Sequence, residues 1–423
     1  MGQSTFIAPN HTPVVQPMAK AGKTRKPHPL FLQVDVPLLL VICTLLVIGL
    51  IMVYSASWNY PNTPNTYTIL LRQARWVLLG VVLAIILSRI DYHTYGRYVV
   101  WMMAVTIALL IAVLGVGETH FNATRTLFKG SVQPSELAKL ATIVYLSFWL
   151  FSKREQISDF FRGLFPMAVI LGVISGLIFL EPDLSAAFTI FVLGGLLFFA
   201  AGGELRQIVL VALVVVLMAS LLITLSDTGK ARLTQYISGL QSPIHASYHV
   251  RRSIEAVVRG QLFGVGLGNS STKYTGLPVP WTDSIFAVIA EETGIVGAST
   301  VVILYLVFLW RGIHIAQRAP DLLGSLLATG ITSWITLEAM INMGVLVNVF
   351  PFAGNALPMI SAGGSSMVTT MVGIGILMSV ARSTVPAPVN NNTERSAPGA
   401  VINLRWRDRR RRLPRNGRSE RPR

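Results

Sequence analysis

Residues 36–54 read VPLLLVICTLLVIGLIMVY, an apolar run that contains no charged side chain. A helix needs about 20 apolar residues to cross the ~30 Å hydrocarbon core of a bilayer, so this run predicts a membrane-spanning helix. Similar runs recur along the chain and predict an all-α polytopic membrane protein with ten transmembrane helices. The ten predicted spans cover residues 36–54, 69–88, 98–117, 134–151, 164–181, 184–201, 207–225, 283–310, 322–348 and 363–382.

The composition of the 423-residue chain excludes several other classes of protein. Hydrophobic residues make up 52% and charged residues 13%, and the mean hydropathy is +0.59. A soluble domain usually carries about 25% charged residues, and a disordered chain has low hydrophobicity. A disulfide framework is also excluded, because Cys43 is the single cysteine of the sequence.

The net charge of +16 is concentrated at the two ends of the chain. Residues 1–34 carry four basic and no acidic side chains, and residues 395–423 hold eleven arginines against Asp408 and Glu420. Because both ends are poor in large apolar residues, 1–34 and 383–423 are predicted to be disordered basic tails around a membrane domain at 35–382. The arginine-rich tail suits contact with anionic lipid, or a solvated topogenic role, better than nucleic acid.

Cationic residues between the predicted spans indicate the orientation of the chain. With the N-terminus inside, the outer loops 55–68 and 349–362 contain no lysine or arginine. This asymmetry predicts that both termini are cytoplasmic. The inner loops then carry Arg89, Arg97, Lys153, Arg154, Arg162, Arg206, Arg311 and Arg318.

A long outer loop, residues 226–282, separates the seventh and eighth predicted spans. Loops of this length are usually functional or disordered. Apolar residues recur in it at helical spacing, which predicts an amphipathic helix in the outer interface, although a solvated helix fits the same pattern. The predicted apolar face consists of Ile244, Tyr248, Ile254, Val257 and Val258.

The same loop is cationic, with six basic residues against two acidic ones. A cationic surface next to a bilayer suits an anionic lipid head group such as a diphosphate. Glycines 264, 266 and 268 follow no predicted strand, so they favour flexibility or close helix packing over a phosphate-binding loop. The charged residues are Lys230, Arg232, Arg251, Arg252, Arg259 and Lys273, against Asp227 and Glu255.

Ionisable residues near the outer ends of the spans are candidates for a functional site, because a charge in a bilayer costs at least about 2.5 kcal/mol. Glu136 and Lys139 are three residues apart and share a helix face, which predicts an ion pair that is either structural or part of a site. Residues 181–183, Glu-Pro-Asp, predict a tight outer turn with acidic side chains at its rim.

Asp283 follows a proline-rich loop and opens a long apolar helix at the outer interface. It is either a cap of that helix or a partly shielded carboxylate that can act as a general base. Glu291, eight residues further along, is expected roughly 12 Å deeper. The sequence contains no histidine–cysteine cluster that indicates a metal site and no defensible Ser-His-Asp arrangement.

Six motifs then follow one another along the membrane domain: Gln133-Pro-Ser-Glu-Leu-Ala-Lys139, Glu181-Pro-Asp-Leu184, the Gly264-to-Gly268 run, Leu277-Pro278, Thr282-Asp-Ser-Ile-Phe-Ala-Val-Ile-Ala-Glu-Glu292 and Leu357-Pro-Met-Ile-Ser-Ala-Gly-Gly-Ser-Ser366. Together and in this order, over roughly residues 36–382, they resemble the SEDS family of FtsW, RodA and SpoVE proteins.

The resemblance implies a ten-helix fold and an inverting peptidoglycan glycosyltransferase, which polymerises lipid II at the outer face of the bacterial cytoplasmic membrane during division or elongation. It implies that Asp283 is the catalytic residue. The charge of the leaving diphosphate would be balanced by cationic side chains or by a divalent cation, Mg²⁺ or Mn²⁺. The predicted substrate-binding residues are Glu136, Lys139, Arg125, Asp183, Arg232 and Lys273.

The implied partners are lipid II, the undecaprenyl-diphosphate-linked glycan, a class B penicillin-binding protein that acts as transpeptidase, and divisome or elongasome proteins. The long basic tails favour the division branch. Two other functions fit the same sequence. The chain could be a lipid II flippase, or a non-catalytic scaffold that recruits a transpeptidase.

Five positions depart from the motifs of the family, and they concern acceptor binding. An Arg-Trp pair is replaced by Arg125-Thr126, and a Tyr-Gln pair by Tyr248-His249. A glutamine of the ninth span is replaced by Glu338, a following glycine by Asn348, and the tyrosine of Ser-Tyr-Gly-Gly by Ala362.

Overall fold

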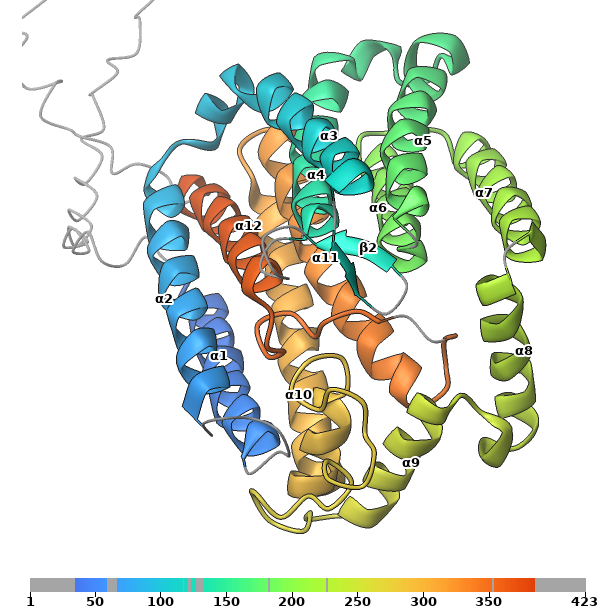
Figure 1. Cartoon of the computed structure of the whole chain (residues 1–423). Coiled ribbons are helices and arrows are strands. Elements are labelled where there is room, and N and C mark those ends of the chain that lie inside the picture. The colour runs from blue at the N-terminus through green and yellow to red at the C-terminus, as the bar shows by residue number, and fades with distance from the viewer. Residues whose placement is uncertain are drawn as a thin grey trace, which may run out of the picture. The chain divides into compact units, whose positions relative to one another are not determined.

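The computed structural model describes residues 35–58, 67–116, 118–120, 123–126, 133–181, 183–225, 227–351 and 354–384. The predicted disordered tails, apart from the last residues of the final helix, lie outside the described residues. The membrane domain is a helical bundle with one short antiparallel hairpin (Figure 1).

The helices and strands are α1 (Val36–Ser57), α2 (Tyr67–Arg89), α3 (Val99–Val116), β1 (Glu118–His120), β2 (Ala123–Thr126), α4 (Pro134–Ser152), α5 (Phe165–Leu180), α6 (Leu184–Ala200), α7 (Leu205–Leu225), α8 (Asp227–Gln241), α9 (Tyr248–Gly260), α10 (Ile285–Arg318), α11 (Leu322–Leu346) and α12 (Gly364–Ser383). Short helical turns η2 (Tyr92–Arg97), η3 (Arg154–Gln156), η4 (Phe160–Leu164) and η5 (Pro243–His245) connect some of them.

Each predicted span coincides with a helix, from α1 to α7 and from α10 to α12. Within the described residues, six helices are long and apolar enough to cross a bilayer. They are α1, α2, the combined segment Phe160–Leu180, α10, α11 and α12. The all-α polytopic membrane fold is confirmed, and the count of ten spans stays a prediction. The small hairpin in the 118–133 loop and helix α8 were not predicted.

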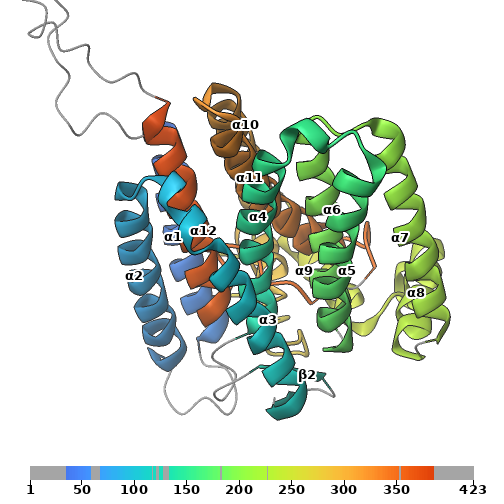
Figure 2. The ribbon, with the colours of Figure 1, turned by 90° about the horizontal axis from the view of Figure 1, so that it is seen from above.

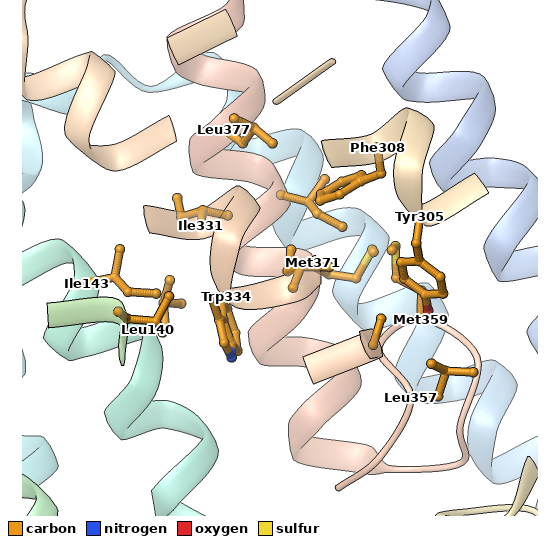
Figure 3. Packing of buried hydrophobic residues seen from close by; sticks show 14 of the residues in the cluster. Leu140, Ile143, Tyr305, Phe308, Ile331, Trp334, Leu357, Met359, Met371 and Leu377 are labelled. Atoms are coloured by element: carbon orange, nitrogen blue, oxygen red, sulfur yellow. The ribbon is translucent and has the colours of Figure 1, made fainter. Parts of the chain in front are cut away.

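Helices α4, α11 and α12 pack against one another inside the bundle, and α2 lies along α12. Trp334 of α11 is fully buried between Leu140 and Ile143 of α4 and Met371 of α12 (Figure 3). A side chain on Gly373 would lie 3.2 Å from the indole, so this glycine makes room for the ring. The apolar packing closes the bundle around Trp334.

The interior is polar at the end of the bundle that carries α8, α9 and residues 261–284. This end is here called the loop end. This end is predicted to be extracytoplasmic. Helices α7 and α8 lie at the side of the bundle next to α6, as both views show (Figures 1 and 2). Polar and charged side chains are buried near the loop end, as described below.

Helix α9 confirms that the long loop contains a helix, but its buried face differs from the predicted apolar face. The buried residues are Val250, Ser253, Ala256 and Gly260. A side chain on Gly260 would collide with the carbonyl oxygen of Ala290, so small residues allow α9 to approach α10 closely. Tyr248 and Val258 are exposed, and their contact with lipid stays a prediction.

Helix α10 is broken at Gly294, where φ is 70° and ψ is −170°. Only glycine adopts this backbone conformation readily. Residues 261–266 fill the break: Val265 N donates to the Glu291 carbonyl (3.0 Å), and Ile295 N donates to the Gln261 carbonyl (2.9 Å). These bonds replace the intrahelical bonds that the break removes. The first segment of α10 is thereby joined to the long loop.

Candidate active site

Asp283 lies at the loop end, directly before α10, and its side chain is half-buried. The N-cap residue of α10 is Ser284, so the interpretation of Asp283 as the N-cap is wrong. The Ser284 hydroxyl donates to the carbonyl of Pro278 (2.6 Å) and leaves the carboxylate of Asp283 beyond the helix end. This position is compatible with a chemical role.

A turn between α11 and α12, residues 354–362, holds the backbone next to Asp283. Ala362 N donates to the Trp281 carbonyl (2.8 Å), and the Ser361 hydroxyl donates to the Thr282 carbonyl (2.7 Å). A side chain on Gly354 would lie 3.2 Å from Asp283 Oδ2. The carboxylate therefore lies against a position that has no side chain.

Two asparagines connect the backbone at Asp283 to the interior of the bundle by hydrogen bonds. The carboxamide nitrogen of Asn342, on α11, donates to the Asp283 carbonyl (3.0 Å) and to the Asn355 carbonyl (2.6 Å). Asn355 Oδ1 accepts a hydrogen bond from the hydroxyl of Ser185, at the start of α6. Ser185 also lies 3.1 Å from Asp183 Oδ1. A series of polar contacts thus runs from Asp283 to Asp183, in which the single Ser185 proton serves either Asn355 or Asp183.

Asp183 is buried, with 6% of its surface exposed, and Glu181 is fully buried. The prediction that these acids stand at the rim of a turn is wrong. The reason is that polar groups from two helices satisfy Asp183. Its Oδ2 accepts from the Ser135 hydroxyl (3.1 Å) and from the Gln133 amide (3.2 Å), and its Oδ1 caps α6 through Ala186 N (3.3 Å).

The ion pair predicted from the spacing of Glu136 and Lys139 is present. Lys139 Nζ lies 2.8 Å from Glu136 Oε1 and also pairs with Glu338 of α11. All three residues are buried. The cluster therefore holds two carboxylates against one ammonium, and Glu136 Oε2 has no hydrogen-bond partner among the described residues. The departure at Glu338 adds the second carboxylate.

Lys273 faces the interior of the loop end. Its ammonium donates to the carbonyls of Ser55 and Gly268 (2.9 Å each) and lies 3.3 Å from Glu292 Oε1. The Lys273 side chain is 0% exposed. In this arrangement the lysine holds the loop to α1 and α10, and its role in substrate binding stays a prediction.

Glu291 is also tied to the long loop, and its expected position deeper in the bundle than Asp283 stays a prediction. Its carboxylate accepts hydrogen bonds from the backbone N–H groups of Ser271 (3.1 Å) and Thr272 (3.3 Å) and from the Ser270 hydroxyl.

Arg232 and Arg125 lie on elements outside the helices that hold the buried carboxylates. Arg232 lies on α8 and borders a small pocket that Tyr236, Ser247 and Asn348 also line. Arg125 lies on β2, and its side chain is outside the described part of the chain. Their predicted roles stay predictions.

Two departures from the family motifs have local explanations. Asn348 has a φ of 60°, the left-handed conformation that glycine adopts freely and asparagine tolerates, so asparagine can replace glycine there. His249 Nε2 lies 2.9 Å from Ser284 Oγ. Because the Ser284 hydroxyl donates to Pro278, the imidazole N–H is the donor. Burial lowers the pKa of His249 to about 4, which keeps the ring neutral at pH 7.

The described residues do not offer a ready site for the predicted divalent cation. No group of three or more histidine, cysteine, aspartate or glutamate side chains in them could hold a metal ion. Mg²⁺ binds through few carboxylates when substrate phosphates supply the other ligands. A cation bound with the diphosphate substrate stays a prediction.

Asn342, Gly354 and Asn355 are parts of the site that the sequence patterns did not predict. A weak signal was present, since Gly354-Asn355 stands between Pro351 and Pro358 in an outer loop without charged residues. Glycine and asparagine favour tight turns. Nothing local in the sequence links this turn to Asp283.

The fold and the buried carboxylates at the loop end define a polytopic membrane protein with a polar site at one end of its bundle. Residues 36–385 match the family described as cell cycle protein, which groups FtsW, RodA and SpoVE. The chain belongs to this family.

Curated relatives are similar over most of the chain. Stage V sporulation protein E of Bacillus subtilis is 36% identical over 353 residues, which cover 82% of this chain and 96% of the relative. A probable peptidoglycan glycosyltransferase FtsW of Thioalkalivibrio sulfidiphilus is 37% identical over 362 residues, which cover 84% and 90%.

Solved structures support the fold. A chain from a peptidoglycan synthase complex that coordinates polymerization and crosslinking superposes with a TM-score of 0.69 and 24% identity, covering 84% of this chain and 99% of that chain. The rod shape determining protein RodA of Thermus thermophilus gives a TM-score of 0.62 and 24% identity, covering 85% and 100%.

Proposed function

We propose that this chain is an inverting peptidoglycan glycosyltransferase that polymerises lipid II, with Asp283 as the general base. The observation that carries the proposal is the setting of Asp283. Its carboxylate is half-buried at the loop end, beyond the start of α10 and against Gly354, while its backbone is fixed by Asn342. Several curated relatives bear the name probable peptidoglycan glycosyltransferase FtsW, which supports the reaction class.

In the proposed reaction, the 4-hydroxyl of the GlcNAc of one lipid II attacks the anomeric carbon of the glycan held as a lipid diphosphate. Asp283 accepts the proton of the attacking hydroxyl, and the undecaprenyl diphosphate leaves with the bonding electrons. A single displacement inverts the α-linked donor to a β-linked product. One carboxylate suffices for this step, whereas a double displacement would need a second nucleophile.

Charge stabilisation is assigned to two of the predicted arginines or to a divalent cation. The developing charge on the diphosphate would be balanced by Arg125, by Arg232 or by a divalent cation. Lys273 is not assigned to this role, because its ammonium already binds Glu292 and two backbone carbonyls. The Glu136–Lys139–Glu338 cluster and Asp183 are proposed to form the buried floor of the substrate site.

The packing around Trp334 favours polymerisation over transport. Trp334, Leu140 and Ile143 are buried and close the interior between α4, α11 and α12 (Figure 3). A lipid flippase would need a polar path through this layer. The break in α10 does not supply such a path, because residues 261–266 of the long loop fill it.

The setting in the cell is part of the same proposal. The chain would lie in the bacterial cytoplasmic membrane with both termini in the cytoplasm, and the loop end would face outward. Its partner would be a class B penicillin-binding protein, and the basic tails favour a place in the divisome over the elongasome.

The test is a polymerisation assay with purified protein in detergent micelles, with lipid II and with or without the cognate transpeptidase. Micelles have no second compartment, so transport cannot produce a signal. We expect glycan strands that muramidase digests. If no polymer forms with the partner present, while the same protein moves lipid II across vesicles, the chain is a transporter. If neither activity is detected, the scaffold interpretation replaces the enzyme.

A further inference from the structure

We propose that Asn342, one helical turn after Glu338 on α11, is a positioning residue for Asp283. The proposal rests on the proposed function and concerns how the same site is held in place. Asn342 does not touch the reacting atoms in this account. It acts through the backbone of Asp283.

The side chain of Asn342 joins two segments of the backbone. Its single NH₂ group donates to two backbone carbonyls, that of Asp283 (3.0 Å) and that of Asn355 (2.6 Å). The residue is 2% exposed. A short planar amide with two N–H donors can bridge two carbonyls, which a hydroxyl or an aliphatic side chain cannot do. Asn342 therefore fixes the distance between the segment that carries Asp283 and the turn that covers it.

The position of Asn342 on α11 places it near the buried ion-paired cluster. Glu338 and Asn342 are four residues apart and thus neighbours on one face of the helix. Glu338 pairs with Lys139 of α4, and Asn342 holds Asp283. A rigid helical turn therefore separates the ion-paired floor of the site from its proposed base. A shift of α11 would move both together.

The turn at Asn355 links Asn342, and through it Asp283, to α4 and α6. Asn355 accepts from Ser185, and Ser185 lies against Asp183, which binds Ser135 of α4. Asp283 is thus held from α11 directly and from α6 through the turn. Small displacements of a reacting group can cost about 100-fold in rate, so loss of this support is expected to reduce turnover.

The experiment compares Asn342→Leu with the unchanged protein in the lipid II polymerisation assay. Leucine has the same branched arrangement of side-chain heavy atoms and no donors. We expect kcat to fall about 10–100-fold, with KM for lipid II within about twofold, because Asn342 orients the base and does not bind substrate. The control is Thr336→Ala on the same helix. The Thr336 hydroxyl is buried and has no hydrogen-bond partner among the described residues, so kcat should not change.

A second variant covers the case in which Asn342→Leu fails to fold. Ser185→Ala removes the bond to Asn355 from a partly exposed position, and we expect it to lower kcat about threefold to tenfold with KM unchanged. In the double variant, the loss should be smaller than the product of the two single losses, since both act through the position of Asp283.

Two results would overturn the proposal: a folded Asn342→Leu protein with unchanged kcat, or a Ser185→Ala effect that appears only in KM. Asp283→Asn, measured in parallel, separates this inference from the proposed function. If Asp283→Asn is inactive and Asn342→Leu is fully active, only the positioning role fails. If Asp283→Asn keeps its activity, the assignment of the base itself fails.

Discussion

Two buried lysines, Lys139 and Lys273, occupy ion-paired clusters in the same molecule, and the clusters differ in how completely they are satisfied. Lys273 has one carboxylate partner, Glu292, and two backbone carbonyls, so charge and hydrogen bonds balance. Lys139 has two carboxylate partners, and Glu136 Oε2 lacks a hydrogen-bond partner within the described residues.

The difference separates a structural cluster from a candidate functional one. Buried polar groups in proteins are nearly always hydrogen-bonded, so an unsatisfied carboxylate oxygen requires an explanation. Both lysines look alike in the sequence, as cations near the outer face. Their partners in the fold distinguish them, and the following changes test whether that distinction holds.

The largest effect is expected for Lys273→Met, which leaves Glu292 buried without its cation. Breaking a buried ion pair costs about 3–5 kcal/mol, so the melting temperature should fall strongly and polymerisation should fall with it. Lys273→Met/Glu292→Met removes both charges and should recover most of the stability. A Lys273→Met protein that keeps its melting temperature but loses activity would move this lysine back to substrate binding.

Lowering the pH should weaken the loop end through His249, whose imidazole contacts Ser284 before α10. Its pKa is about 4 in the folded protein and about 6.5 when unfolded, so the unfolded chain binds a proton first. Stability should therefore fall as pH drops from about 6.5 to 4, by at most about 3 kcal/mol. The check is the melting temperature across this range. His249→Gln should flatten the profile, and an equally steep profile would exclude His249 as its cause.

A smaller effect is expected for Gly354→Ala, which tests the crowding beside Asp283. The added methyl group would lie 3.2 Å from Asp283 Oδ2, which is tight enough to displace the carboxylate. We expect kcat to fall about tenfold with little change in melting temperature. Gly172→Ala is the matched control, since a methyl group there meets no atom within 4 Å. Equal activity of the two variants would show that the Asp283 carboxylate does not lie against Gly354.

The smallest effect is expected for Glu338→Gln, which removes the extra charge of the Lys139 cluster. Glu136 remains 2.8 Å from Lys139, so the ion pair persists and the cluster becomes neutral. We expect stability to be kept and the polymerisation rate to stay within about twofold. A loss of tenfold or more would mean that the second carboxylate of this cluster has a role of its own.

Much of the fold, and the local part of the site, could be predicted from the sequence. The apolar runs give the helices, and the i, i+3 spacing of Glu136 and Lys139 gives their ion pair, because helix geometry is local. Asp283 was identified from the family motif, and its position at the loop end agrees with a candidate role.

The remaining contacts depend on pairs far apart in the chain, which local patterns do not encode. Asn342 lies 59 residues from Asp283, and Ser185 lies 170 residues from Asn355. The break at Gly294 depends on backbone bonds from residues 261–266. Lys273 could not be distinguished from an exposed cation, because its partners lie on α1 and on the first segment of α10.

The most direct test is the initial rate of lipid II polymerisation by Asp283→Asn protein relative to the unchanged chain, in micelles with the transpeptidase present. Asparagine keeps the shape of the side chain and cannot accept the proton. The rate should fall at least about 100-fold while the melting temperature stays the same. A folded Asp283→Asn protein that polymerises at more than half the original rate would contradict the account.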